Sequence, residues 1–76
     1  MSHDTTERLV RMANQIATFF LSQPESGRIE GVANHINKFW EPRMRRELFE
    51  HIDKGGEGLM PMVIEASRTI KRPIAA

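Results

Sequence analysis

The sequence predicts an all-α fold, a small bundle of about four short helices in which the first two are a similar amphipathic pair. Apolar residues recur at helical spacing in four segments, prolines and glycines divide these segments, and none shows the sustained alternation of a strand. A chain of 76 residues forms at most one domain. We therefore expect residues 1–76 to be a single helical domain with frayed ends at 1–5 and 73–76.

The first helix is expected to begin at Asp4 or Thr6 and to run to Phe20. Asp4 and Glu7 have the spacing of an acidic capping box, in which side chains satisfy the free N–H groups of the first turn. Six apolar residues then share one face of the helix. They are Leu9, Met12, Ala13, Ile16, Phe19 and Phe20. The serines, proline and glycine of residues 22–27 end the pattern.

The second helix repeats the first at a shift of twenty residues. "VANHINKFW" aligns with "MANQIATFF", and Ala, Asn, Ile and Phe are identical in the two. The second apolar stripe consists of Ile29, Val32, Ala33, Ile36, Phe39 and Trp40. We expect the two helices to bury equivalent faces against each other as a hairpin. Two such units are too few for a solenoid, which needs about three repeats.

Prolines mark the limits of the last two helices. Pro42 disfavours a helical residue before it and suits the first turn of a third helix. The loop "KGGEG" supplies a glycine cap at the end of that helix. Pro61 opens a fourth helix and Pro73 closes it. The inner faces are expected to hold Met44, Leu48 and Ile52 in the third helix, and Met62, Val63, Ala66 and Ile70 in the fourth.

Composition excludes several functional classes. The chain has no cysteine, so it has no disulfide, no thiolate metal site and no thiol nucleophile. Its net charge of +1 is far from the basic balance typical of nucleic-acid binders. No apolar run is long enough to cross a membrane, and the first residues lack the features of a signal peptide. We expect a soluble, cytoplasmic protein that binds neither membrane nor nucleic acid.

The titratable residues do not suggest catalysis or metal binding. His35 and His51 lack the HxxxH or HExxH spacing that places two metal ligands on one helix face. A nucleophile–base arrangement cannot be assembled from neighbouring residues, and four short helices leave little room for a pocket. We therefore expect no catalytic residue, no metal ligand and no cofactor.

The stretch "KFWEPRMRREL" concentrates aromatic and cationic side chains at the junction of the second and third helices. Trp40 is interpreted either as a core residue or, beside the arginines, as an interface hot spot. Glutamates interleave the arginines, which is typical of a solvated face and would weaken binding to phosphates. Arg45 flanks the apolar stripe, where it must snorkel or meet an acidic partner. We predict a helix corner with one edge left for docking.

Other residues on the predicted surface favour a docking role. Asn14 and Asn34 lie opposite the apolar stripes at equivalent places in the two repeats, Ile64 points away from its stripe, and Phe49 lies at the edge of its own. Isolated exposed apolar residues are normal, but these lie near an arginine-rich edge. The predicted partner contacts are Phe39, Trp40, Pro42, Arg43, Met44, Arg45, Phe49, Ile64, Asn14 and Asn34.

Three motifs carry a family resemblance. "LVRMANQIATFF", "GVANHINKFWEPRMR" and "GGEGLMPMVIEA", in that order, resemble the delta subunit of soluble, NAD-dependent, molybdenum-containing formate dehydrogenases, over Leu9 to Ile70. The resemblance implies a non-catalytic, cofactorless accessory subunit that supports assembly, stability or molybdenum-cofactor maturation. The expected partner is the alpha subunit, which carries the molybdenum centre and iron–sulfur clusters. The beta and gamma subunits of the same complex pass electrons through flavin to NAD.

The residues alone leave a second class open, a free-standing helical homodimer or a regulatory module that binds protein or nucleic acid. Exposed Phe49 and Ile64 could serve self-association. A steep salt dependence of binding would favour the nucleic-acid alternative. No feature of the sequence recommends an enzyme in its own right.

Overall fold

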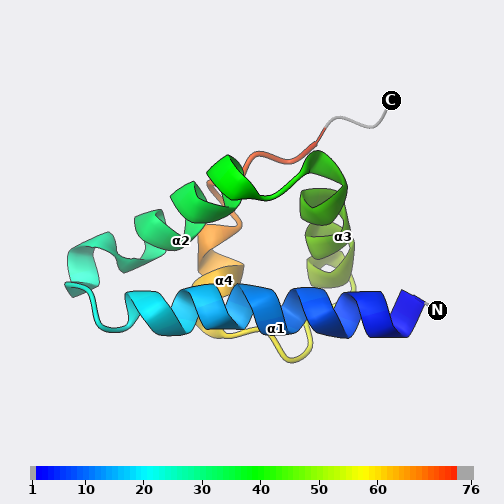
Figure 1. Cartoon of the computed structure of the whole chain (residues 1–76), viewed down its shortest axis with the longest axis horizontal. Helices are drawn as coiled ribbons and strands as arrows, with labels where there is room; N and C mark the ends of the chain where they lie inside the picture. Colours follow the sequence, from blue (N-terminus) through cyan, green and yellow to red (C-terminus); the bar gives the residue numbers. More distant parts are fainter. Residues whose placement is uncertain (1, 74–76) are drawn as a thin grey trace.

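The computed structural model describes residues 2–73, with side chains from Thr5 onwards, and this range consists of helices and loops without strands. The helices are α1 (Ser2–Phe20), α2 (Glu25–Phe39), α3 (Pro42–Asp53) and α4 (Pro61–Ala66) (Figure 1). The predicted all-α bundle of four short helices is confirmed. Of the ends expected to fray, residues 2–5 belong to α1, and residues 1 and 74–76 lie outside the described range.

α1 begins earlier than the capping pattern predicted. It starts at Ser2, which places Asp4 inside the helix, so the predicted start at Asp4 or Thr6 is wrong. The end at Phe20 is confirmed. With 19 residues α1 is the longest helix described, yet no helix in residues 2–73 is long and apolar enough to cross a bilayer.

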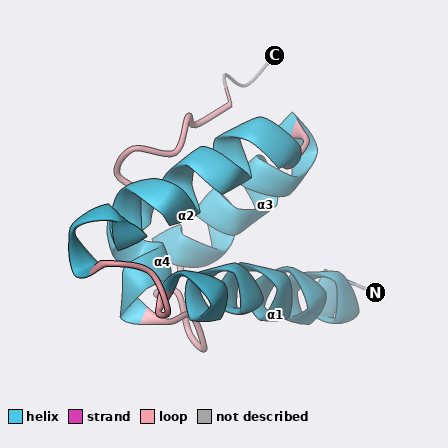
Figure 2. Cartoon of the chain, turned by 60° about the vertical axis from the view of Figure 1, so that its left-hand side comes forward, coloured by secondary structure: helices cyan, strands magenta, loops and turns pink. Residues whose placement is uncertain are grey.

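α1 and α2 form the predicted hairpin. The two helices pack against each other, converge at the loop of residues 21–24 and diverge towards their other ends (Figures 1 and 2). At the closed end the ring of Phe20 lies so close to Gly31 that a Cβ atom on residue 31 would overlap it. The glycine is therefore what allows the two helices to meet there.

Both ends of α3 lie where the sequence marks them. Glu41 has an extended backbone and Pro42 is the first helical residue, as predicted. At the other end the Gly56 N–H donates to the His51 carbonyl at 2.9 Å, which is the long-range bond of a Schellman motif. Gly55 and Gly56 have positive φ angles of 119° and 66°. The predicted glycine cap is confirmed.

α4 is shorter than predicted. It begins at Pro61 as expected but ends at Ala66, well before the proline that was predicted to close it. The Ser67 hydroxyl donates to the Ile64 carbonyl at 2.5 Å and so competes with the bonds that would continue the helix. Ile70 thus reaches the core from a turn rather than from a helix.

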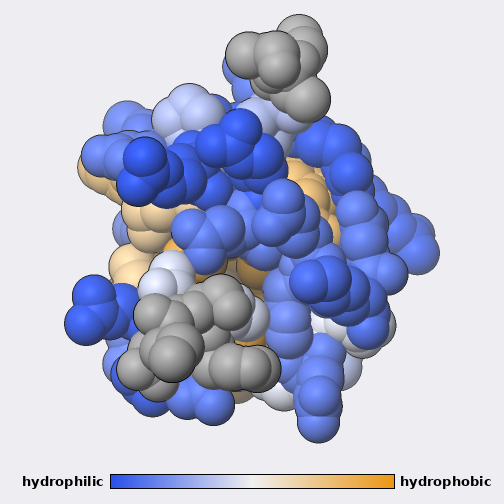
Figure 3. Space-filling view, turned by 90° about the vertical axis from the view of Figure 1, so that its right-hand side faces the viewer, coloured by the Kyte–Doolittle hydropathy of each residue, from blue (hydrophilic) through white to orange (hydrophobic). Residues whose placement is uncertain are grey.

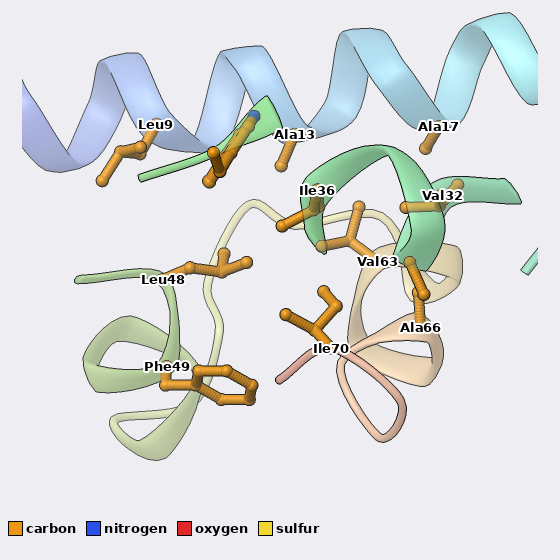
Figure 4. Packing of buried hydrophobic residues seen from close by; sticks show 12 residues of the cluster. Leu9, Ala13, Ala17, Val32, Ile36, Leu48, Phe49, Val63, Ala66 and Ile70 are labelled. Atoms are coloured by element: carbon orange, nitrogen blue, oxygen red, sulfur yellow. The ribbon is translucent and has the colours of Figure 1, made fainter. Parts of the chain in front are cut away.

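The core lies where the inner faces of the four helices meet (Figure 4). α4 packs against α2 and α1, and α3 packs against α1. Ile36, Leu48 and Val63, from three different helices, are fully buried at its centre. The buried apolar residues are Leu9, Ala13, Ala17, Val32, Ala33, Ile36, Trp40, Leu48, Phe49, Val63, Ala66 and Ile70. All the inner positions predicted for α3 and α4 belong to this core or pack against it.

Candidate partner-binding surface

The residues of the α2–α3 junction (residues 39–45) that drew attention in the sequence divide into an inner and an outer set. Trp40 caps the end of α2 with an extended backbone, and its side chain is only 6% exposed. Trp40 is therefore a core residue. Met44 is half-buried against the same core. Pro42 and Arg43 are exposed, so they are the junction residues of α3 that remain available to a partner.

Arg45 binds the main chain of the C-terminal segment. Its Nη1 donates to the Lys71 carbonyl at 2.6 Å. A charged donor makes a stronger hydrogen bond than a neutral one, so this contact fastens residues 69–73 to α3. Of the two alternatives predicted for Arg45, the acidic partner is wrong, because a backbone oxygen takes the place of the carboxylate.

Arg72 completes this attachment and covers Phe49. The Arg72 guanidinium carbon lies 4.4 Å from the centre of the Phe49 ring, and its Nη2 lies 3.1 Å from the Asp53 carboxylate. Phe49 is only 6% exposed and belongs to the core, so its predicted exposure is wrong. Ile64 is half-buried and lies against the glycine loop, where a Cβ atom on Gly56 would come within 2.7 Å of its Cδ1.

Asn14 performs a structural task that the sequence did not predict. Its Nδ2 donates to the Gly58 carbonyl at 2.9 Å, and its Oδ1 accepts the Met60 N–H at 2.9 Å. The side-chain amide thereby pairs with both main-chain groups that flank Leu59, which packs against the core. The equivalent residue of the second repeat, Asn34, is exposed. The prediction that both asparagines point away from the fold is therefore wrong for Asn14.

Asn37 makes the matching pair of bonds on α2. Its Nδ2 donates to the Thr69 carbonyl at 3.2 Å, and its Oδ1 accepts the Lys71 N–H at 2.7 Å. These main-chain groups flank Ile70, which is buried. Sequence reasoning missed Asn37 because the repeat directed attention to Asn34. Its partners lie more than thirty residues away, so no local pattern reveals it.

Two phenylalanines at equivalent repeat positions are the most exposed large apolar residues described. Phe19 is 61% exposed, so its predicted place on the buried face is wrong. Phe39 is 64% exposed, so it is not buried with the apolar stripe but is available as the partner contact that was also predicted. The buried face of α1 centres instead on Ala13 and Ala17, which are fully buried. Small residues let helices approach closely, and the packing face turns towards them. Ala17, four residues after Ala13, was the available signal.

Phe19 lines an open groove between α1 and α2 of about 560 Å³, which we call the α1–α2 groove. Its walls are Met12, Gln15, Ile16 and Phe19 from α1, and His35 and Trp40 from α2. The Phe39 ring packs on His35, with 4.8 Å between ring centres, and therefore stands on the rim. Nζ of Lys38 lies 5.6 Å from the centre of the Phe39 ring. The groove is apolar, with an amine beside one edge.

The opposite end of the molecule has a different surface. Figure 3 views the side on which α3 and the N-terminal half of α1 lie, and that face is mainly hydrophilic. A shallow hollow there is lined by Glu7, Arg11, His51 and Glu57 among others. Nε2 of His51 lies 2.7 Å from the Glu57 carbonyl, so the histidine is engaged by the loop that follows α3. Within the described residues no three histidine, aspartate or glutamate side chains are grouped to hold a metal ion.

Comparison with known proteins gives one family. The family model described as NADH-dependent formate dehydrogenase delta subunit FdsD matches residues 8–67. The match includes α2, α3 and α4 in full and all of α1 except its first turns. No curated protein and no solved structure matched the chain.

Proposed function

The chain belongs to the delta-subunit family of NADH-dependent formate dehydrogenases, and from this membership we propose that it is a single-domain, non-catalytic accessory subunit of such a complex. The oxidation of formate to carbon dioxide with reduction of NAD takes place on the other subunits. The alpha subunit, which would carry the molybdenum centre, is the proposed direct partner, and the beta and gamma subunits belong to the same assembly in the cytoplasm.

One observation supports a role in assembly, namely the exposure of Phe19 and Phe39. Burying a whole phenylalanine side chain is worth about 1.5–3 kcal/mol, so covering the exposed three-fifths of both rings would contribute roughly 2–4 kcal/mol. Exposed apolar side chains that gather at one place are a feature of interaction sites, and Phe19 and Phe39 both contact the same groove, Phe19 as a wall and Phe39 through His35. A subunit that is permanently bound to a larger protein can carry such apolar side chains on its surface, because the partner covers them.

Such a subunit would act by mass action. A ligand that binds only the folded or cofactor-loaded form of the alpha subunit stabilises that form by ~2.7 kcal/mol when its concentration is about a hundred times Kd. The same coupling would retain a subunit whose molybdenum cofactor has been inserted. Assembly, stability and cofactor maturation are thus three consequences of one binding equilibrium. The exposed junction residues Phe39, Pro42 and Arg43, with Asn34 on α2, are proposed to lie in or beside the contact.

The test is copurification from cells that express the other subunits with and without this chain. We expect the tagged chain to bring down the alpha subunit. We also expect molybdenum content and formate-dependent NAD reduction, measured on the same samples, to be lower when the chain is absent. Absence of binding together with unchanged molybdenum and activity would refute the proposal.

A helical homodimer is the second candidate, and the same two exposed phenylalanines favour it. Light scattering of the isolated chain separates the two functions. A concentration-independent mass near 8.8 kDa excludes the homodimer. A mass of twice that value, combined with failure to bind the alpha subunit, would make the homodimer the leading account.

A further inference from the structure

We propose that the α1–α2 groove is the docking site for the formate dehydrogenase partner, and that its occupant is a convex ridge of apolar side chains, with an acidic residue opposite Lys38. This inference rests on the proposed function and specifies the surface that performs it. It moves the centre of the contact from the α2–α3 junction to the outer side of the helical hairpin.

The residues that line the groove favour the binding of apolar side chains. Met12, Ile16, Phe19 and Trp40 present hydrocarbon, sulfur and ring surfaces, and none of the lining side chains carries a carboxylate. Water in such a groove has few hydrogen-bond partners, so its release favours an apolar ligand. Phe39 extends the same surface over the rim through its contact with His35. The hottest residues of protein interfaces are large side chains of this kind in pockets that become fully desolvated.

The polar groups of the groove would fix the position at which the partner segment binds along it. Gln15 on α1 and His35 on α2 can donate or accept hydrogen bonds, and the indole N–H of Trp40 can donate one. Lys38 lies beside the rim, with its amine 5.6 Å from the centre of the Phe39 ring. An acidic residue of the partner at this edge would meet both the amine and the positive edge of the aromatic ring. The expected partner segment is therefore an amphipathic helix with an acidic residue flanking its apolar stripe.

The shape and area of the groove favour a different protein over a second copy of this chain. In a two-fold dimer whose axis passes through the groove, the hollow along Met12 and Ile16 would face another hollow. The exposed parts of Phe19 and Phe39 amount to roughly 200–300 Å², taking about 150–250 Å² for each whole side chain. Obligate homodimers bury about 2,000 Å² or more. A patch of this size suits the centre of a standard interface between two different proteins.

The experiment measures the affinity of the purified chain for a formate dehydrogenase complex prepared without it. Phe19→Ala, Phe39→Ala and the double variant are compared with the wild-type chain. We expect each single change to weaken binding at least about tenfold and the double change to bring it close to the detection limit. Lys38→Glu is expected to weaken binding further at low salt than at high salt, because it places a like charge opposite the acidic residue.

Two further variants test whether the effect is specific to the groove. Leu21→Ala removes an exposed apolar side chain, 45% exposed, that does not line the groove. Arg43→Ala removes an exposed charge from the junction. We expect Leu21→Ala to bind within about twofold of the wild type. Arg43 lies in or beside the proposed contact, so Arg43→Ala is expected to weaken binding, but less than either phenylalanine change. The helical circular dichroism and denaturation midpoint of every variant are measured first, so that loss of fold is not mistaken for loss of contact.

The outcomes are distinguishable. If the wild-type chain binds and the Phe19/Phe39 double variant binds equally well, the groove is not the site, while the proposed function stands. If Arg43→Ala weakens binding and the phenylalanine variants do not, the contact lies on the junction. If the wild-type chain binds no subunit, the proposed function fails and the docking site fails with it. Loss of self-association in the phenylalanine variants would instead assign the groove to a second copy.

Discussion

The α2–α3 junction and the α1–α2 groove meet at the end of α2. Two neighbouring residues there differ sharply in how much of their side chain is exposed. Trp40 belongs to both regions; it is 6% exposed, is part of the core and forms an inner wall of the groove. One residue earlier, Phe39 is 64% exposed on the rim of the groove. A cluster of aromatic and cationic residues in the sequence therefore does not by itself show which side chains are exposed to a partner. The tryptophan and Arg45 contact this chain itself, whereas a phenylalanine that fits a core pattern remains uncovered.

The cause of the difference is the position of the third and fourth helices. α4 packs against α2 and α1 from one side of the hairpin, and α3 packs against α1 near the junction. Figure 4 shows Ile36, Leu48 and Val63 meeting on that side. Within residues 2–73 no helix packs on the outer side of the hairpin, so the apolar residues whose faces turn outwards form a groove instead of a core.

The largest expected effect contrasts the two neighbouring aromatic residues. Trp40→Ala should lower the free energy of unfolding by about 3–5 kcal/mol, because it leaves a large cavity in the core. Phe39→Ala should change it by no more than about 0.5 kcal/mol, since the ring is mostly in solvent. Urea denaturation followed by circular dichroism measures both. A loss of similar size in the two variants would mean that Phe39 is buried in solution and that the contrast does not hold.

The next prediction separates two arginines of the junction. Arg45→Met keeps the apolar stem but removes the bond to the Lys71 carbonyl, and should cost about 1–2 kcal/mol of folding stability, as expected for a charged hydrogen bond at a half-buried site. Arg43→Met should be close to neutral. The measurement is again the denaturation midpoint. Equal effects would show that residues 69–73 are not held by Arg45.

The same pair matters for binding experiments. A variant in which both arginines are replaced combines a surface change with a structural one, so its loss of binding could not be assigned to an interface. Arg43 alone tests the surface of the junction, because its side chain is exposed and no hydrogen bond or ion pair is described for it.

The smallest effect concerns the closed end of the α1–α2 hairpin. Both glycines lie in α2, but a Cβ atom at Gly27 would meet nothing within 4 Å, whereas one at Gly31 would overlap the Phe20 ring. Gly27→Ala should therefore gain up to about 1 kcal/mol of stability from higher helix propensity. Gly31→Ala should show no such gain, because the ring must move. Thermal denaturation of the two variants tests this, and an equal gain in both would mean that the hairpin end is more open than described.

Several elements of the fold could be predicted from the sequence because their signals are local. Pro42 and Pro61 open α3 and α4, and Gly55 and Gly56 close α3 through backbone angles that other residues avoid. The end of α4 was missed because the hydroxyl of Ser67 competes with the helix there. The beginning of α1 was missed because Asp4 has the chemistry of a capping residue yet lies within the helix.

The candidate site was less predictable than the limits of the helices. A stripe of apolar residues shows which side of a helix is apolar, but not whether another helix covers that side. Spacing alone assigned Phe19 to a buried face and Phe49 to the surface, and it placed Phe39 in an apolar stripe although Phe39 was also a predicted partner contact. Burial depends on which other helices arrive and from where. Phe49 packs into the core, and Arg72, far along the chain, lies 4.4 Å from the centre of its ring.

By itself the sequence determined the four helices, most of their limits, the pairing of the first two and the family. These features depend on residues within a few positions of one another and on the period of the α-helix. Only the tertiary structure determined that Asn14, and not the equivalent Asn34, binds the main chain on either side of Leu59. It also determined that Phe19 and Phe39 are exposed while Trp40 is buried. Such outcomes depend on contacts between residues far apart in the chain, which the helical period does not encode.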